Sequence, residues 1–210
     1  MAQLAREQVV YRPLEETDFD AVASLYERLW CSGLDELVAP RAGRLAAATY
    51  LAISPLGLVA SIGNRVLGVV LARDGFERRV ARWEGIRDEL AGEARRLGLA
   101  EELESSLSVD RSELSLATGY SREGERFSQA QMTLLAVSPD AHGLGIGSGL
   151  FDRMSSMIAL TGASGFFLTT DDECDWGYYE YRGLSRISAH EVDGADGSPL
   201  TVYLYGKELG

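Results

Sequence analysis

The chain has 210 residues, of which 46% are hydrophobic and 25% are charged, an ordinary composition for one globular domain with a sizeable core. Its 32 Asp and Glu residues outnumber its 20 Lys and Arg residues, and the net charge of -12 argues against nucleic-acid binding, which depends on basic surface. A solvated acidic surface explains this charge, and a cationic small-molecule or peptide partner is compatible with it.

Cysteine, histidine and hydropathy patterns exclude several other classes. The two cysteines and two histidines lie far apart in the chain, so neither a disulfide framework nor a metal site is indicated. No run of about twenty apolar residues occurs that would span a membrane. Residues 1–8 carry charge but no apolar signal core, so we expect a cytoplasmic location.

The first seventy residues predict alternating strands and helices. Thr17 suits the N-cap of a helix, with Asp20 three places on as in a variant capping box. Gly63 and Asn64 separate two apolar runs and predict a hairpin turn. In chain order, we expect a strand at 9–14, a helix reaching residue 29, a helix at 34–50, and strands at 57–62 and 66–72.

A segment at about 74–126 predicts a helical hairpin between the third and fourth strands. Its apolar residues recur at helical spacing over 80–97, Gly98 interrupts, and a second, shorter stripe follows over 99–107. The charged residues around 121–124 indicate an exposed loop. The hairpin is either a packing or dimerisation element or a lid over the functional site. The lid is suggested by its place directly before the strand that leads into that site.

The next stretch predicts a strand, a glycine-rich turn and a helix. A period of two over residues 129–136 is typical of a strand. We expect one face of this strand to carry its apolar residues, Ala130, Met132, Leu134 and Ala136. The other face is expected to carry the polar residues Gln129, Gln131 and Thr133. The glycine-rich turn at 142–148 then opens a helix that ends at Gly162.

This turn suits an anion, because the first turn of a helix leaves its backbone N–H groups unpaired and the helix dipole adds partial positive charge. Glycines remove the Cβ atoms that would keep an anion away, and no Lys or Arg occurs between Gln129 and Asp152. The sequence therefore predicts a diphosphate site made by the backbone. Its spacing departs from the dinucleotide pattern, since the third glycine comes one place too early, and the mononucleotide loop with its lysine is missing.

The remaining residues predict a strand at 165–170, an acidic turn at 171–175, a short aromatic helix at 176–181 and two last strands at 185–192 and 200–206.

The turn at 137–148 resembles the acyl-coenzyme A signature of the GCN5-related N-acetyltransferase (GNAT) superfamily. That signature is an Arg or Gln followed by x-x-Gly-x-Gly/Ala, preceded by Val-x-Pro. Here Val137-Ser138-Pro139, Gly145 and Gly147 match it, and His142 stands where Arg or Gln is usual. Downstream, Tyr178-Tyr179-Glu180-Tyr181-Arg182-Gly183-Leu184 resembles the family's aromatic-Tyr-x-x-x-Gly element.

The resemblance implies one GNAT-type α/β domain over residues 1–210, with a mixed, twisted sheet of about seven strands flanked by helices. The helical hairpin at about 74–126 is an insertion relative to the minimal family pattern. The order of strand, two helices and hairpin before this insertion agrees with the family.

The resemblance also implies a site for acetyl-coenzyme A, with no metal. The pantetheine arm would pair with the strand backbone at Leu135, Ala136 and Val137. The diphosphate would lie on the turn, at His142, Gly143, Leu144, Gly145, Ile146, Gly147 and Ser148. Asp172 stands where the family often has an Asn that contacts the pantetheine arm, so that contact is altered here.

The implied reaction is direct attack of an amine on the thioester in a ternary complex, with a backbone N–H near Leu135 stabilising the oxyanion. Tyr179 occupies the position of the family's proton donor to the leaving thiolate, and a phenol with a pKa near 10 is protonated at neutral pH. Tyr178 and Tyr181 are expected to be buried aromatic residues. The strand offers no base, which leaves a water chain or one of the carboxylates of the acidic turn, Asp171, Asp172, Glu173 and Asp175.

Several alternatives remain open at this point. The acyl group is acetyl or longer, and the acceptor is a small-molecule or peptide amine, or an alcohol. A catalytically idle member that binds acyl-coenzyme A as a sensor or scaffold is motivated by the missing base. A regulator that binds ATP or NAD at the turn is a third possibility. A homodimer is common in this superfamily.

Overall fold

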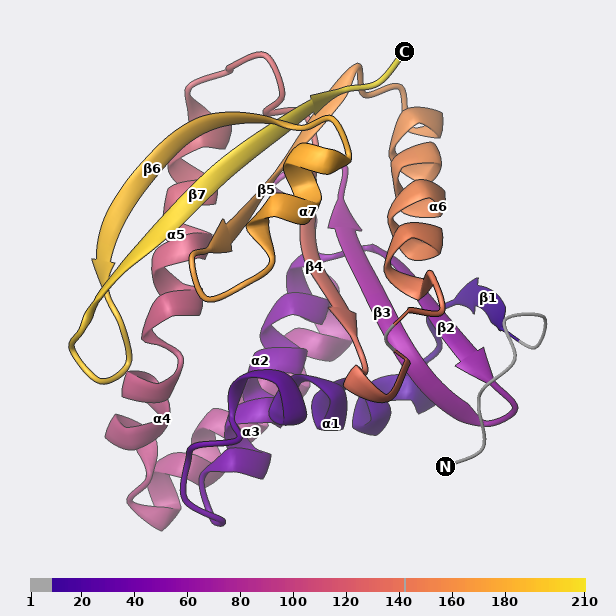
Figure 1. Cartoon of the computed structure of the whole chain (residues 1–210). Helices are drawn as coiled ribbons and strands as arrows, with labels where there is room; N and C mark the ends of the chain where they lie inside the picture. Colours follow the sequence, from indigo (N-terminus) through magenta and orange to yellow (C-terminus); the bar gives the residue numbers. More distant parts are fainter. Residues whose placement is uncertain (1–8, 142) are drawn as a thin grey trace.

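A computed structural model of the protein describes residues 9–141 and 143–210, and it contains one seven-stranded sheet with helices on both faces (Figure 1). The strands are β1 (Val10–Pro13), β2 (Leu56–Ile62), β3 (Arg65–Arg73), β4 (Gln131–Val137), β5 (Gly165–Asp171), β6 (Ser185–Asp193) and β7 (Pro199–Glu208). They lie in the order β1-β2-β3-β4-β5-β7-β6, with β4 and β5 parallel and the other neighbours antiparallel. The predicted mixed sheet of about seven strands flanked by helices is confirmed.

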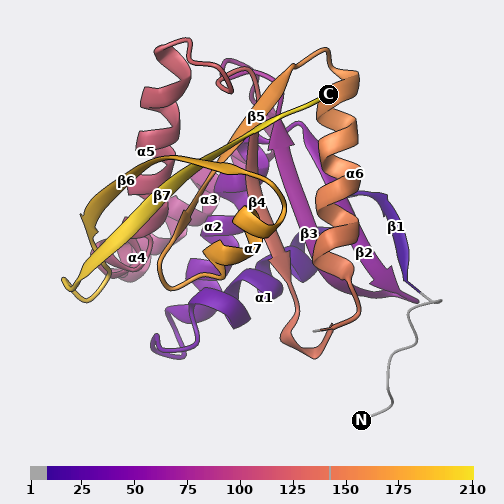
Figure 2. The ribbon, with the colours of Figure 1, turned by 45° about the horizontal axis from the view of Figure 1, so that its top comes forward.

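Helices cover both faces of the sheet and divide the core in two. They are α1 (Phe19–Trp30), α2 (Ala39–Ile53), α3 (Ala81–Leu97), α4 (Ala100–Ser106), α5 (Ser108–Arg122), α6 (Ile146–Leu160) and α7 (Trp176–Tyr181). The helix α6 packs on one face, where Phe151 and Met154 are fully buried with Phe166 of β5. On the other face lie α1 and α2, whose Val22 and Leu51 pack in one cluster with Val69 of β3 (Figure 2).

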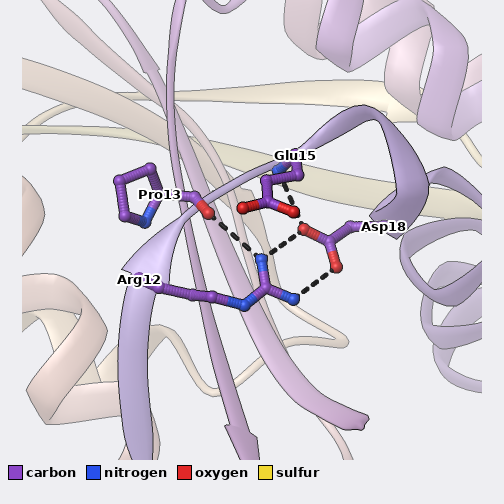
Figure 3. Close-up of polar contacts among 4 residues, drawn as sticks. All are labelled: Arg12, Pro13, Glu15 and Asp18. Atoms are coloured by element: carbon purple, nitrogen blue, oxygen red, sulfur yellow. Dashed lines mark hydrogen bonds and ion pairs between the residues drawn. The ribbon is translucent and has the colours of Figure 1, made fainter.

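An ion pair fixes the start of α1. Asp18 is only 4% exposed, and its two carboxylate oxygens accept hydrogen bonds of 2.7 Å from the guanidinium of Arg12 on β1 (Figure 3). The backbone N–H of Glu15 also donates to Asp18, at 2.8 Å. The helix start therefore depends on Asp18 and a 3-10 turn at Glu16–Asp18, and the predicted N-cap at Thr17 is wrong. The hydrogen bonds from Arg12 are the main reason that the pKa of Asp18 is lowered.

We expect Asp18→Asn to destabilise the protein by about 1.5–3 kcal/mol, because a charge-assisted pair is lost and Arg12 is left without its partner. A lowered pKa means that the ionised Asp18 stabilises the fold above its ordinary value of 3.8 and that this contribution is lost as the pH falls below it. The difference in the free energy of unfolding between wild type and variant, measured with urea, should therefore become smaller at acid pH. Asp20→Asn, at an exposed carboxylate on the first turn of α1, is the control, and equal stability of the two variants would contradict the expectation.

Three helices, and not two, connect β3 to β4. The second limb of the predicted hairpin is divided at Leu107 into α4 and α5, and α5 continues through residues 121–122, where a loop was predicted. The sequence pattern missed α5 because its inward face is not uniformly apolar. Asp110 and Glu113 point to the interior from the same helix that packs Ala117 against Phe167 of β5.

The predicted division of β4 into an apolar and a polar face is wrong. The register with β3 changes from Leu71↔Leu134 to Ala72↔Met132, so Thr133 is an extra residue in β4. Such a bulge reverses the side-chain alternation. Ala130 and Met132 pack on the α6 side, whereas Leu134 and Ala136 pack with α1 and α2.

The polar residues of β4 are also buried. Gln131 is 1% exposed and accepts hydrogen bonds of 2.8 and 2.5 Å from Arg73, whose pKa is lowered to about 9 by burial. Thr133 shares a hydrogen bond of 2.6 Å with Ser54 at the end of α2. Both faces of β4 are therefore covered by helices, and the polar side chains are satisfied by partners that are distant in the sequence.

Candidate active site

A cavity of about 730 Å³ opens where β4 and β5 separate. Gln131 and Phe167 form the one registered pair between these strands, and the two strands then diverge toward their carboxyl ends (Figure 1). The cavity walls come from α1, α2, α5, β4, β5, the start of α6, the acidic turn with α7, and the β6–β7 connection.

The backbone of β4 has one edge on this cavity. On its other edge, Leu135, Ala136 and Val137 pair with Val70, Val69 and Gly68 of β3, and no registered partner on β5 faces them. All three residues line the cavity. An extended amide-bearing chain could therefore add to this edge as a strand does, which is the arrangement expected for a pantetheine arm.

The glycine-rich turn lies at the end of the same cavity. Gly145 is the N-cap of α6 and has a φ of 76°, in the left-handed region that favours glycine. Gly145, Ile146, Gly147 and Ser148 line the cavity, whereas Gly143 and Leu144 lie in the turn beside it. His142 lies outside the described residues.

Gly147 leaves open space at the first turn of α6. A Cβ atom there would meet only Val137 Cγ2, at 3.6 Å, which is an ordinary van der Waals contact. The packing of the protein therefore does not require glycine at this position. The space is open to a ligand that approaches the backbone N–H groups of the first turn, and the diphosphate site there stays a prediction.

The aromatic helix α7 forms another wall. Tyr178 and Tyr179 line the cavity, with Tyr178 edge-on to Phe151 of α6 at 6.1 Å between ring centroids. Burial is the main reason that the pKa of Tyr179 is well above that of an ordinary phenol, and the nearby Cys174 and Glu113 add to it. Tyr179 is therefore protonated at neutral pH. Tyr181 is 85% exposed, so its prediction as a buried residue is wrong; the short helix turns it to solvent.

The acidic turn before α7 is divided between the cavity and its surroundings. Asp171, Glu173 and Asp175 line the cavity. Asp172 is exposed and does not line it; its carboxylate accepts a hydrogen bond of 3.1 Å from the backbone N–H of Thr201 on β7. The altered pantetheine contact at Asp172 stays a prediction.

Cys174 belongs to the same wall. Burial raises the pKa of its thiol to about 12, with a further contribution from the charge of Asp171. The thiol is therefore protonated and a poor nucleophile at neutral pH. A partly buried, protonated thiol fits a packing role for Cys174.

Two partly buried carboxylates on α5, Asp110 and Glu113, line the cavity and were not predicted as site residues. Asp110 Oδ1 accepts hydrogen bonds from the hydroxyls of Tyr26 and Tyr50, at 2.5 and 2.8 Å. Burial is the main reason that the pKa values of Asp110 and Glu113 are raised, most strongly for Glu113. One signal in the sequence could have found them, because two carboxylates three positions apart lie on one side of a helix.

Two other features of the described residues bear on function. Within residues 9–141 and 143–210, no helix is long and apolar enough to cross a membrane. The same residues contain no group of three or more His, Cys, Asp and Glu side chains suited to hold a metal ion.

Neither a protein-family model nor a curated protein sequence matches this chain significantly, but solved structures match its fold. A GCN5-related N-acetyltransferase from Kribbella flavida has a TM-score of 0.59 and 13% identity, over 98% of this chain and 100% of that one. One from Rhodopseudomonas palustris has a TM-score of 0.56 and 14% identity, over 99% and 100%. The ribosomal-protein-S18-alanine N-acetyltransferase of Escherichia coli has a TM-score of 0.58 and 12% identity, over 96% and 94%.

These comparisons establish the fold of the chain as that of the GNAT acetyltransferases. In this chain the cavity lies where β4 and β5 separate, next to the glycine-rich turn.

Proposed function

We propose that this protein is an N-acetyltransferase that moves the acetyl group of acetyl-coenzyme A to an amine by direct attack in a ternary complex. The observation that carries the proposal is the convergence of three features on one cavity: the open edge of β4 at Leu135–Val137, the open first turn of α6 at Gly147, and Tyr179. GNAT acetyltransferases as structural neighbours support the same class of reaction.

The proposed binding mode uses the protein backbone. The pantetheine arm pairs with the β4 edge at Leu135, Ala136 and Val137, and the diphosphate accepts hydrogen bonds from the N–H groups at the start of α6. The turn from His142 to Leu144 and the altered contact at Asp172 belong to the same proposal. This binding directs the thioester toward the wall that contains Tyr179, with a backbone N–H near Leu135 stabilising the oxyanion.

In the proposed reaction, the acceptor nitrogen forms a bond to the carbonyl carbon, the carbon–sulfur bond breaks, and the hydroxyl of Tyr179 gives its proton to the leaving sulfur. The raised pKa of Tyr179 keeps this proton in place over the neutral range. No covalent enzyme intermediate is needed, and the protonated thiol of Cys174 is in accord with that.

Thermal unfolding with separate ligands tests the proposal. We expect acetyl-coenzyme A and coenzyme A to raise the melting temperature, because a ligand at about one hundred times its dissociation constant stabilises the folded state by roughly 2.7 kcal/mol. ATP and NAD should leave it unchanged, because the glycine spacing departs from both nucleotide loops. A shift with ATP or NAD alone would overturn the proposal in favour of a nucleotide-binding regulator.

A catalytically idle member that binds acyl-coenzyme A as a sensor or scaffold is the second candidate. Its motivation is the absence of a base on β4, where Gln131 and Thr133 are engaged by Arg73 and Ser54. Release of coenzyme A thiol in the presence of an amine panel distinguishes the two, and butyryl-coenzyme A in the same assay tests for a longer acyl group.

We further propose a cytoplasmic enzyme that works without a metal and without nucleic-acid or membrane partners, assembled as a homodimer. Light scattering of the purified protein during gel filtration tests the assembly.

A further inference from the structure

The end of the cavity formed by α5 combines negative charge with aromatic hydroxyls. Asp110 accepts hydrogen bonds there from Tyr26 of α1 and Tyr50 of α2, and Glu113 of the same helix lines the same cavity. Thr169 of β5 lines the cavity beside Glu113. No Lys, Arg or His occurs among the described residues that line the cavity.

These carboxylates have no cationic partner from the described part of the chain, although burial makes an isolated charge costly. Tyr26 and Tyr50 both donate to the same oxygen, Oδ1 of Asp110. The pKa of Glu113 is raised by burial and then by the negative charges of Asp110 and Asp171, whereas Thr169 lowers it. An ammonium group is the ligand that would satisfy both carboxylates, because it supplies positive charge and three N–H donors.

The position of Glu113 also relates this end of the cavity to the reacting atoms. Glu113 lines the same cavity as Cys174 and as Tyr179, the proposed proton donor. Burial is the main reason that the pKa values of these two groups are raised, and the charge of Glu113 adds to it. Glu113 comes from the segment between β3 and β4 and not from β4 itself.

We propose that the acceptor is a cationic primary amine that Asp110 and Glu113 bind at this end of the cavity, and that Glu113 is the base that removes its proton. This inference rests on the proposed acetyl transfer. Glu113 takes one proton from the ammonium, and the free amine then attacks the thioester. The nitrogen loses its second proton as the carbon–sulfur bond breaks, and Tyr179 protonates the sulfur. One proton is released to solvent overall, and the products are the amide and the free thiol.

Glu113 must be ionised to act, so its environment sets the pH dependence. The titratable groups that face it are Asp110 on α5, Asp171 on β5, Tyr26 and Tyr50 on α1 and α2, and Cys174 and Tyr179 on the wall opposite. The raised pKa places the acid limb of kcat/KM above pH 4.5, the ordinary value for glutamate. An ammonium bound beside it works in the opposite direction and favours the ionised form.

The test is the pH profile of thiol release with acetyl-coenzyme A and three acceptors, 1,4-diaminobutane, n-pentylamine and 4-aminobutanoate. For wild type, we expect the order diamine, monoamine, amino acid, because the cavity repels a carboxylate. Glu113→Gln should lower kcat/KM at pH 7 by roughly 100-fold or more. Its activity should rise toward that of wild type as the pH approaches the amine pKa of about 10.4, where the acceptor no longer needs a base.

Two further variants separate this role from a structural one. Asp110→Asn should raise KM for the amine more than it lowers kcat. Glu102→Gln, at an exposed carboxylate on α4, should behave as wild type. A Glu113→Gln profile that parallels wild type at every pH, a preference for 4-aminobutanoate, or turnover of none of the acceptors would overturn the inference. The proposed function fails separately, if acetyl-coenzyme A does not stabilise wild-type protein.

Discussion

Tyr179→Phe is expected to slow the release of coenzyme A thiol by roughly tenfold or more, with the affinity for acetyl-coenzyme A unchanged. This substitution removes only the hydroxyl group, so the packing of the ring against Tyr178 and Tyr205 is kept. Without the phenol, the sulfur must leave as a thiolate or take its proton from water. Steady-state kinetics combined with a binding titration of acetyl-coenzyme A measures both quantities.

Tyr181→Phe is the matched control, because it removes the same hydroxyl from the same helix at an exposed position. We expect it to behave as wild type.

A raised pKa means that Tyr179 keeps its proton above the pH at which an ordinary phenol loses it, so wild type should show no basic limb from this group below about pH 10. Unchanged thiol release in Tyr179→Phe would contradict its role as general acid and leave the rest of the site in place.

Gly147→Val is expected to weaken the binding of acetyl-coenzyme A by roughly tenfold or more, which corresponds to at least about 1.4 kcal/mol. The side chain would occupy the space before the first turn of α6 where the diphosphate is proposed to bind. Folding should be little affected, because a Cβ at Gly147 meets only Val137 Cγ2 at 3.6 Å. Isothermal titration with coenzyme A and a thermal melt without ligand test the two statements.

Gly85→Val is the control for this substitution. Gly85 lies within α3 and a Cβ there meets nothing within 4 Å, so the change in helix propensity is matched while the cavity is untouched.

His142→Ala tests whether a side chain contributes instead of the backbone. The prediction of a backbone site would be wrong if His142→Ala abolished binding of the coenzyme while Gly145→Val and Gly147→Val left it intact.

The segment between β3 and β4 was predicted either as a packing or dimerisation element or as a lid, and its role stays a prediction. The apolar residues of α3 and α4 join the core formed with α1 and α2, including Trp83 and Leu103. The polar residues of α5 contribute Asp110 and Glu113 to the cavity. These carboxylates weaken the motivation for an idle protein, because a candidate base is present although β4 supplies none.

The sequence by itself determined the elements with strong local signals. The hairpin around Gly63 and the order of strand, glycine turn and helix at 131–160 follow from hydrophobic periodicity and from glycines at positions of special conformation, such as Gly145. The mixed sheet followed from the resemblance to the GNAT superfamily. The placement of Tyr179 on a short helix after β5 followed from its resemblance to a family motif. These features depend on residues that are close together in the chain.

The tertiary structure alone decided which distant residues share the cavity. The bulge at Thr133 is visible only in the register with β3, and it sends Leu134 to the face opposite Met132. The packing of α5 beside β5 brings Glu113 to Thr169, 56 positions away along the chain by difference of their numbers. The physical reason is that periodicity reports whether a face is buried, but not what covers it. A partly buried carboxylate interrupts the apolar pattern of a helix. For this reason α5, the helix that carries the proposed base, was not predicted from the sequence.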